Sequence, residues 1–110
     1  MQIICDKHDK ALVMALSGRM DRVAAMEFEK AFTEWLKNGE RCFVVDMKDL
    51  EYISSAGLRS LLSANQQLKD SNGQIRLCNV SGLVKDVFVI SGFESLFSMY
   101  HSYADAVKFK

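Results

Sequence analysis

The residues best placed to do chemistry in this sequence are two adjacent hydroxyls, Ser54 and Ser55, followed by the small residues Ala56 and Gly57. An apolar strand candidate at 42–47 precedes them, and a strongly periodic helix follows them. The serines therefore lie at or just before a helix N-terminus, where backbone N–H groups lack partners and the helix dipole is positive. A hydroxyl caps a helix well there, and an added anion is tolerated. The pair predicts either a plain cap with a solvent-facing hydroxyl or a site of covalent modification.

Other catalytic and ligand-binding patterns are weak. The sequence contains neither G-x-G-x-x-G nor G-x-x-x-x-G-K-[ST], so no dinucleotide or triphosphate site is predicted. The Ser-Ser-Ala-Gly turn lacks the first glycine of G-x-S-x-G, and no acid and histidine pair is obviously placed to complete a triad. Asp46 and Asp49 could bind a hard cation, but without a third convergent carboxylate they favour a solvated strand end. We therefore expect no enzymatic activity, no cofactor and no metal.

Composition and cysteine use indicate the compartment. The formal net charge is +0, with acids and bases interspersed, so no nucleic-acid partner is expected. No apolar stretch is long enough to cross a membrane, and the N-terminus shows no signal-peptide pattern. The cysteines Cys5, Cys42 and Cys78 are widely separated and lie in apolar contexts, typical of small buried residues in a reducing compartment. These features predict a cytoplasmic protein with no direct membrane insertion.

Hydrophobic patterns predict the elements that position the two serines. The predicted strands are 3–7, 11–16, 42–47, 74–80 and the short 99–100, with 17–21 as a break after the second. The predicted helices run from 23 to 38, from about 56 to 72, over 83–91 and after 102. Asp21 and Ser102 are expected to cap the first and last of them. The order predicts one α/β domain over residues 1–110, built on a single-layer, mixed, mostly parallel sheet of four or five strands with about four helices.

The stretch from Asp46 to Leu62, Asp-Met-Lys-Asp-Leu-Glu-Tyr-Ile-Ser-Ser-Ala-Gly-Leu-Arg-Ser-Leu-Leu, resembles the signature of STAS domains. It is most similar to that of the stand-alone bacterial anti-sigma factor antagonists. Gly18-Arg-Met-Asp21 is similar to the family's G-x-L-D, and the stretches 39–46, 73–80 and 90–97 also fit. The resemblance covers about residues 18–110 and implies a STAS-like fold.

This resemblance implies a partner-switching mechanism. In the family, the unmodified antagonist binds an anti-sigma factor with serine kinase activity and so frees a sigma factor for transcription. The anti-sigma factor then phosphorylates the antagonist and ends the interaction, and a protein serine phosphatase reverses the modification.

The family's phosphoacceptor lies two residues before the motif glycine, which is Ser55 in this sequence. Ser54 stands where the family often has an acidic residue, so Ser54 is the alternative acceptor. Nearby carboxylates, Asp21 or Asp46, are expected to add repulsion to the phosphate. The implied partner-binding residues are Gly18, Met20, Asp21, Ser54, Ser55, Ala56, Gly57, Leu58 and Arg59.

Two other functions remain open for a chain with this resemblance. STAS domains also serve as cytoplasmic subunits of membrane lipid-transport ABC complexes, where the same turn contacts an ATPase without being phosphorylated. A third role is that of a scaffold module in a larger signalling assembly.

Overall fold

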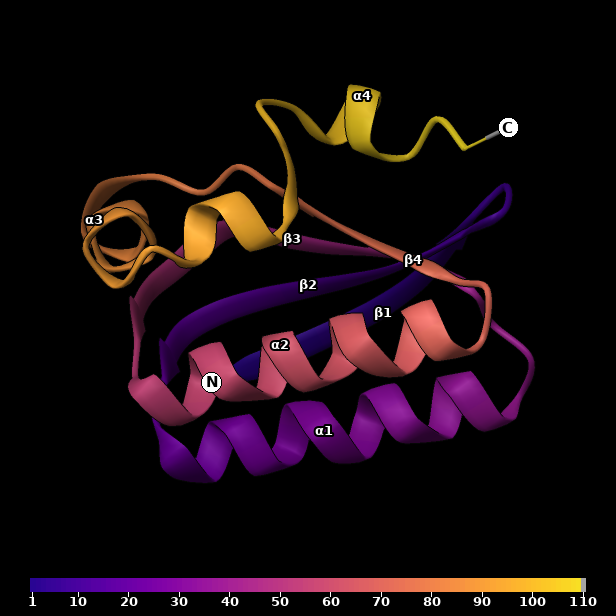
Figure 1. Cartoon of the computed structure of the whole chain (residues 1–110), viewed down its shortest axis with the longest axis horizontal. Helices are drawn as coiled ribbons and strands as arrows, with labels where there is room; N and C mark the ends of the chain where they lie inside the picture. Colours follow the sequence, from indigo (N-terminus) through magenta and orange to yellow (C-terminus); the bar gives the residue numbers. More distant parts are fainter. Residues whose placement is uncertain (110) are drawn as a thin grey trace.

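The computed structural model describes residues 1–109 and places its strands in one sheet with the order β1-β2-β3-β4-β5 (Figure 1). The strands span Gln2–His8 (β1), Ala11–Met20 (β2), Cys42–Ile53 (β3), Gln74–Cys78 (β4) and Ser98–Tyr100 (β5). The helices span Arg22–Lys37 (α1), Ser55–Asp70 (α2), Gly82–Ser91 (α3) and Tyr103–Ala106 (α4), with the 3-10 turn η1 at Phe93–Leu96. The predicted fold class and element order are confirmed.

The pairing of the strands brings several chain segments to one edge of the sheet. β1 pairs antiparallel with β2, whereas the pairs β2-β3, β3-β4 and β4-β5 are all parallel. Each parallel pair requires a crossover, and α1, α2 and α3 supply these crossovers. The carboxyl ends of β2 and β3, where Met20 pairs with Ile53, therefore lie beside the N-termini of α1 and α2.

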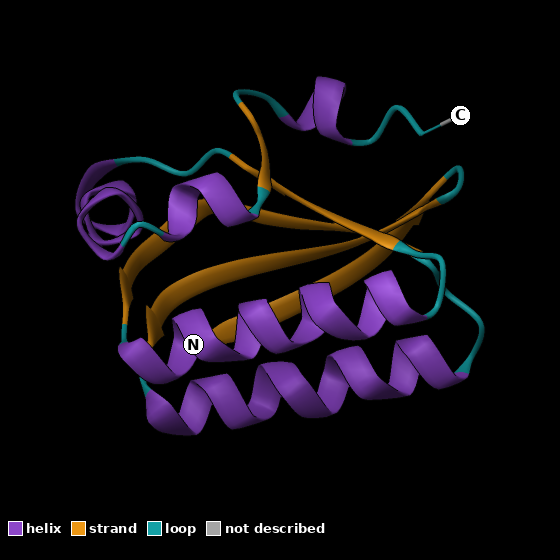
Figure 2. Ribbon diagram, viewed as in Figure 1, coloured by secondary structure: helices purple, strands orange, loops and turns teal. Residues whose placement is uncertain are grey.

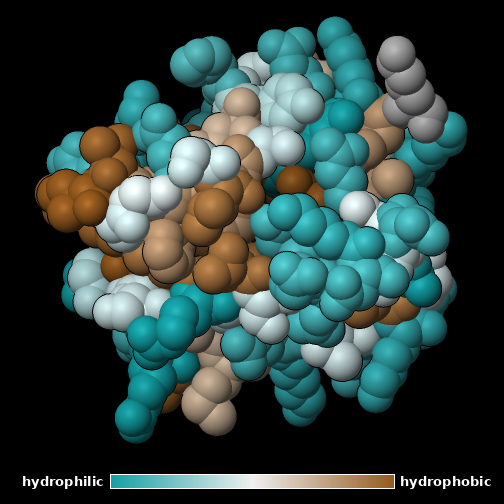
Figure 3. Space-filling model, viewed as in Figure 1, coloured by the Kyte–Doolittle hydropathy of each residue, from teal (hydrophilic) through white to brown (hydrophobic). Residues whose placement is uncertain are grey.

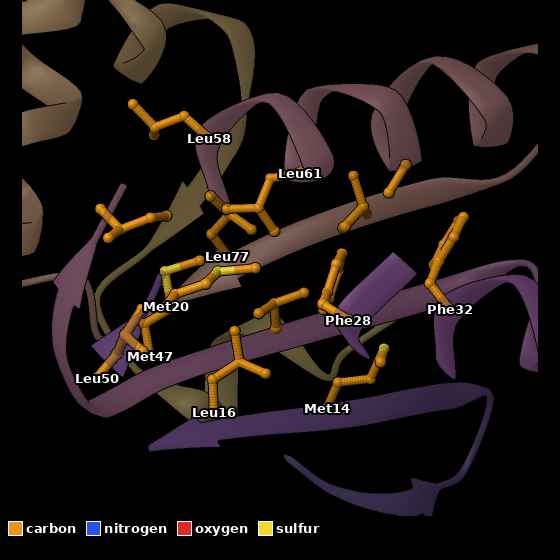
Figure 4. Packing of buried hydrophobic residues seen from close by; sticks show 14 of the residues in the cluster. Met14, Leu16, Met20, Phe28, Phe32, Met47, Leu50, Leu58, Leu61 and Leu77 are labelled. Atoms are coloured by element: carbon orange, nitrogen blue, oxygen red, sulfur yellow. The ribbon is translucent and has the colours of Figure 1, made fainter. Parts of the chain in front are cut away.

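The main core lies between the sheet and α1, α2 and α3. α1 and α2 run side by side along the sheet (Figure 2). Figure 4 shows Phe28 and Phe32 of α1, and Leu61 of α2, among side chains from the strands. All three are at most 1% exposed, and α3 adds Val84 and Phe88 to the same cluster. Burying a side chain of this size contributes about 1.5–3 kcal/mol, so these contacts fix the helices on the sheet.

The opposite face of the sheet carries a smaller apolar cluster that α4 covers. The cluster consists of Ala11, Val13, Val44, Cys78, Ala106 and Val107. Arg76 fastens the C-terminal segment, because its Nη1 donates hydrogen bonds to the carbonyls of Ala106 at 3.1 Å and Lys108 at 2.9 Å. Its guanidinium carbon also lies 3.8 Å from the centroid of the Phe109 ring. One arginine thus holds the segment that covers this face.

Two strands run further than the sequence predicts. β2 continues to Met20 through a segment expected to be a break. β3 continues to Ile53 through Lys48 and Asp49, which were expected to mark the chain leaving the sheet. Two register shifts, one after Ala15 and one directly after Gly18, each place one more residue in β3 than in β2 and keep the two strands paired to their ends. The long β2-β3 pair carries the start of α2 well beyond β4.

The three cysteines differ in burial. Cys78 is fully buried, and this burial, followed by the charge of Asp46, raises the pKa of the Cys78 thiol to about 12. Its thiol is therefore protonated at neutral pH. Cys5 and Cys42 are half-buried. The expectation of small buried residues is confirmed for Cys78 and only partly met by the other two.

Candidate functional site

Ser54 joins β3 to α2 and fixes the start of the helix. Its backbone is extended, with φ −86° and ψ 170°, and its Oγ accepts a hydrogen bond from the N–H of Gly57 at 3.1 Å. Its own N–H donates to the carbonyl of Met20 at 2.9 Å, which ties the end of β2 to the same turn. Ser54 is therefore an N-cap whose side-chain oxygen already serves the helix.

Ser55 is the first residue of α2, and its environment is different. The residue is exposed, and its hydroxyl makes no side-chain hydrogen bond within the described residues 1–109. It lies in the first helical turn, where the dipole and the free N–H groups stabilise negative charge. The Oγ of Ser55 is thus open to a reagent or a protein, at a position where an added phosphate costs the fold little.

Gly57 allows the helix to approach the ends of the two strands closely. A Cβ at this position would lie 2.8 Å from Cγ1 of Ile53 and 3.1 Å from both Cγ and Sδ of Met20. These distances are shorter than normal carbon contacts, so a larger residue would push α2 away from the sheet. One turn further, the buried Ser60 donates its hydroxyl hydrogen bond to the Gly57 carbonyl at 2.7 Å. The absence of a side chain at Gly57 thus determines how closely the start of α2, which carries the two serines, packs against the ends of β2 and β3.

The end of β2 forms one side of the site. Gly18 has a φ of +90°, a left-handed conformation that glycine adopts without strain, and it precedes the second register shift. The next residue, Arg19, holds its guanidinium carbon 4.3 Å from the centroid of the Tyr52 ring on β3. Asp21 caps α1 as predicted, because its Oδ1 accepts from the N–H of Ala24 at 2.9 Å.

An open groove of about 580 Å³ runs beside the serine turn. One wall comes from the end of β3 and the start of α2, and consists of Tyr52, Ile53, Ser54, Ser55, Leu58 and Arg59. The other wall comes from α3 and the residues after it, and consists of Val87, Ile90, Ser91 and Phe93. Within the described chain, Arg59 is the only charged residue that lines this groove. The site therefore combines a free hydroxyl, an apolar trough and one guanidinium.

The family model of the STAS domain matches residues 2–106. The chain belongs to the STAS domain family. Its relatives include BtrV of Bordetella bronchiseptica, a protein named as an anti-sigma factor antagonist. BtrV is 39% identical to this STAS chain over 102 residues, which cover 93% of this chain and 88% of BtrV.

Solved structures of anti-sigma factor antagonists have the same fold as this STAS chain. One from Thermotoga maritima superposes with a TM-score of 0.88 at 19% identity, covering 94% of this chain and 90% of the other. The Bacillus protein SpoIIAA in its phosphorylated form gives a TM-score of 0.75 at 18% identity, covering 96% of both chains. At these identities the structural likeness shows the shared fold.

The STAS fold brings the predicted partner-binding residues to one end of the molecule. Asp21, Ser55 and Arg59 are exposed there. Gly18, Ser54 and Ala56 are half-buried. Met20, Gly57 and Leu58 are buried, so the side chain of Met20 and the backbone of Gly57 shape the surface from below. Leu58, although 5% exposed, lines the groove.

Asp46 is not close enough to repel a phosphate on Ser55, contrary to the sequence-based expectation. It lies in the middle of β3, where its Oδ1 accepts hydrogen bonds from the N–H of Lys48 at 3.1 Å and the amide of Asn79 at 3.0 Å. Asp46 pairs with Ala15 and Ile53 with Met20, so the two β3 residues lie five steps of β2 apart, about 17 Å at about 3.4 Å per residue. The expectation was wrong because β3 was predicted to end at Met47, which would have placed Asp46 beside the turn.

Sequence reasoning missed much of the groove lining, because the predicted partner-binding residues did not include Tyr52, Ile53, Val87, Ile90, Ser91 and Phe93. Tyr52 and Arg19 were not singled out because their contact joins two strands, and no local pattern shows such a pairing. Val87 was interpreted only as part of an apolar helix, and Ile90 as the end of that helix and the start of the stretch 90–97 that fits the family. The available signal was the count of apolar residues on α3, which exceeds what one buried face needs.

Within residues 1–109, no group of three or more His, Cys, Asp or Glu side chains is arranged to hold a metal ion. Over the same residues, every helix of this STAS chain is too short or too polar to traverse a lipid bilayer.

Proposed function

We propose that this chain is an anti-sigma factor antagonist, and that phosphorylation of Ser55 ends its binding to an anti-sigma factor with serine kinase activity. The observation that carries the proposal is the contrast between the two serines. Ser54 uses its Oγ to cap α2 at Gly57, whereas Ser55 is exposed and has no side-chain partner in the described chain. Membership of the STAS family and the naming of BtrV support the same function.

The site supports a switch that acts at the binding surface while the fold stays intact. Phosphorylation adds about −1.5 to −2 charges and three acceptor oxygens. At the first turn of α2 this charge faces free N–H groups, so the helix tolerates it. A partner packed over Ser55 and the apolar groove would meet a bulky, solvated anion, and burying that anion unpaired is costly. The modification therefore removes the partner without unfolding the antagonist.

The site carries charged side chains of both signs near Ser55, namely Asp21 and Arg59. Asp21 is exposed at the neighbouring start of α1, and its carboxylate adds repulsion to an anion on Ser55. Arg59 follows Ser55 by four residues on α2, so the two side chains share one helix face. A protein serine phosphatase that restores the free hydroxyl would complete the cycle, because Ser55 is accessible to solvent in this fold.

Calorimetric titration with a purified anti-sigma factor kinase tests the proposal. Each such kinase of the source organism is titrated with the wild-type chain, and one that binds is then used with Ser55→Ala, Ser55→Asp and Ser54→Asp. We expect Ser55→Ala to bind as wild type does. Ser55→Asp should bind about ten-fold more weakly or worse, because it places a carboxylate on the buried contact.

The Ser54→Asp variant is the matched control, since aspartate is an equally good N-cap and adds the same charge one residue earlier. Because Ser54 also lines the groove, this variant should lose some affinity, but less than Ser55→Asp, since its carboxylate is held at the helix by the N–H of Gly57. Equal affinities of Ser55→Ala and Ser55→Asp, with both variants folded, would contradict the charge switch. Failure of the wild-type chain to bind any of these kinases would contradict the antagonist function itself.

A further inference from the structure

α3 presents apolar side chains in two directions, and only one of them is buried. Val84 and Phe88 join the main core and anchor the helix. Leu83, Val89 and Ile90 lie outside the core, with 71%, 55% and 86% of their surfaces exposed. In Figure 3 apolar side chains gather over the end of the molecule formed by α3 and η1. The buried side chains of α3 therefore hold the helix in place, while its exposed apolar side chains face solvent.

The groove makes this exposed helix continuous with the serine turn. Ile90 and Val87 line one wall, and Ser55, Leu58 and Arg59 line the other. Ser55 and the α3 wall line the same groove, so a protein that fills the groove beside Ser55 also contacts α3. An isolated surface serine turn is also too small for a specific interface, which buries about 800 Å² and 20–30 residues on each partner.

We propose that the α3 wall of this groove is part of the surface that binds the anti-sigma factor partner, with Ile90 as its main contact. The partner inserts an apolar side chain between Leu58 and Ile90 and places a carboxylate against Arg59. This inference rests on the proposed function and names the part of the antagonist that its partner reads beyond the serine turn.

The chemistry of the groove selects this occupant. Its lining is apolar except for serine and tyrosine hydroxyls and the single guanidinium of Arg59. An apolar side chain excludes water from such a trough, and a carboxylate is the matching charge for an arginine at its rim. The same arrangement explains release, since a phosphate on Ser55 would enter the trough that the apolar side chain occupies.

The test compares two neighbouring residues of α3 that differ in their relation to the groove. Ile90 lines it, whereas Val89 is exposed on the same helix and does not. Ile90→Ser and Val89→Ser are titrated by calorimetry into the purified anti-sigma factor kinase that binds the wild-type chain. Because both side chains are exposed, both variants should keep the thermal unfolding temperature of the wild type. Ile90→Ser should weaken binding by about ten-fold or more, and Val89→Ser by less than about three-fold.

Arg59→Gln tests the charged part of the contact. It should weaken binding and reduce the dependence of the association rate on salt, because a rim charge acts mainly on the encounter. An unchanged salt dependence would overturn the carboxylate contact at Arg59.

The outcomes separate this inference from the proposed function. Loss of binding in Ser55→Asp with equal affinities for Ile90→Ser and Val89→Ser would overturn the α3 contact and leave the antagonist function intact. A chain that forms dimers in solution, which Ile90→Ser dissociates without weakening kinase binding, would also overturn it, because a second copy would then be the occupant. If the wild-type chain binds none of the kinases, the proposed antagonist function is contradicted, and the α3 contact that rests on it is contradicted with it.

Discussion

The two hydroxyls at the start of α2 differ in what their oxygens contact. Ser54 Oγ lies 3.1 Å from the N–H of Gly57 and satisfies one of the free donors of the first turn. Ser55 contributes no such bond in the described chain and remains exposed. One residue therefore stabilises the helix, and the next is available for modification.

This difference predicts that alanine substitutions at the two serines change the stability by different amounts. Ser54→Ala should lower the free energy of unfolding by about 1 kcal/mol, because it leaves the Gly57 N–H without its cap. Ser55→Ala should change it by less than about 0.5 kcal/mol, since an exposed hydroxyl is lost and alanine favours the helix. Urea denaturation followed by circular dichroism measures both values. A larger loss for Ser55→Ala than for Ser54→Ala would contradict the assigned roles.

At the scale of elements, the position of the site depends on how closely α2 approaches the ends of β2 and β3. Gly57 provides the close contact, with Ile53 and Met20 directly below it. In an exposed helix position, Gly→Ala stabilises by about 1 kcal/mol. Here the added Cβ would meet Ile53 Cγ1 at 2.8 Å, so the packing cost outweighs the gain in helix propensity.

We therefore expect Gly57→Ala to destabilise the protein by about 1–3 kcal/mol. The variant should also lose affinity for the partner, because the shift of α2 displaces Ser55 and Leu58 together. Thermal unfolding and calorimetric binding measure the two effects. A Gly57→Ala variant more stable than the wild type would show that α2 does not need this close approach.

Elements were predictable from the sequence where local pattern and tertiary environment agree. The amphipathic spacing of α1 and its Asp21 cap predicted that helix well, because one face is buried and the other is solvated. β3 was cut short at Met47 because Lys48, Asp49 and Glu51 resemble a loop. Beyond Asp46, β3 pairs with β2 but has no β4 residue opposite it. This part of the strand is therefore at the edge of the sheet, where polar residues are accommodated.

The candidate site was predictable only in part. A serine pair before a periodic helix could be located from local sequence, and so could the cap at Asp21. The assignment of Ser54 as the cap required the actual start of α2. The α3 wall of the groove depends on the position of a helix about thirty residues away, and no local pattern shows which of its apolar residues are exposed.

At the scale of the whole molecule, the main core covers one face of the sheet, and the C-terminal segment covers part of the other face. Arg76 is the main link to that segment, through two carbonyl hydrogen bonds and its contact with Phe109. This cluster lies on the face opposite α1 and α2, away from the serine turn. Substitutions in the C-terminal segment and in the serine turn should therefore act independently of each other.

Arg76→Ala should release the C-terminal segment while leaving the site unchanged. We expect faster amide hydrogen exchange over residues 103–109 and a loss of about 2 kcal/mol in unfolding free energy, because two charged hydrogen bonds disappear. Arg41→Ala is the control, since Arg41 also donates to two carbonyls, those of Leu36 and Glu40, but at an exposed loop. Partner affinity should match the wild type in both variants. Weaker partner binding by Arg76→Ala would contradict the independence of the C-terminal segment and the serine turn.

The central claim is that Ser55, and not Ser54, is the residue whose modification switches this molecule. The most direct measurement is site-resolved mass spectrometry of the wild-type chain after incubation with its binding kinase and ATP. Fragmentation distinguishes phosphate on the two adjacent serines, and Ser54→Ala and Ser55→Ala serve as matched substrates. The account predicts phosphate on Ser55 in the wild type and in Ser54→Ala, with none incorporated in Ser55→Ala. Phosphate found on Ser54 alone would contradict it.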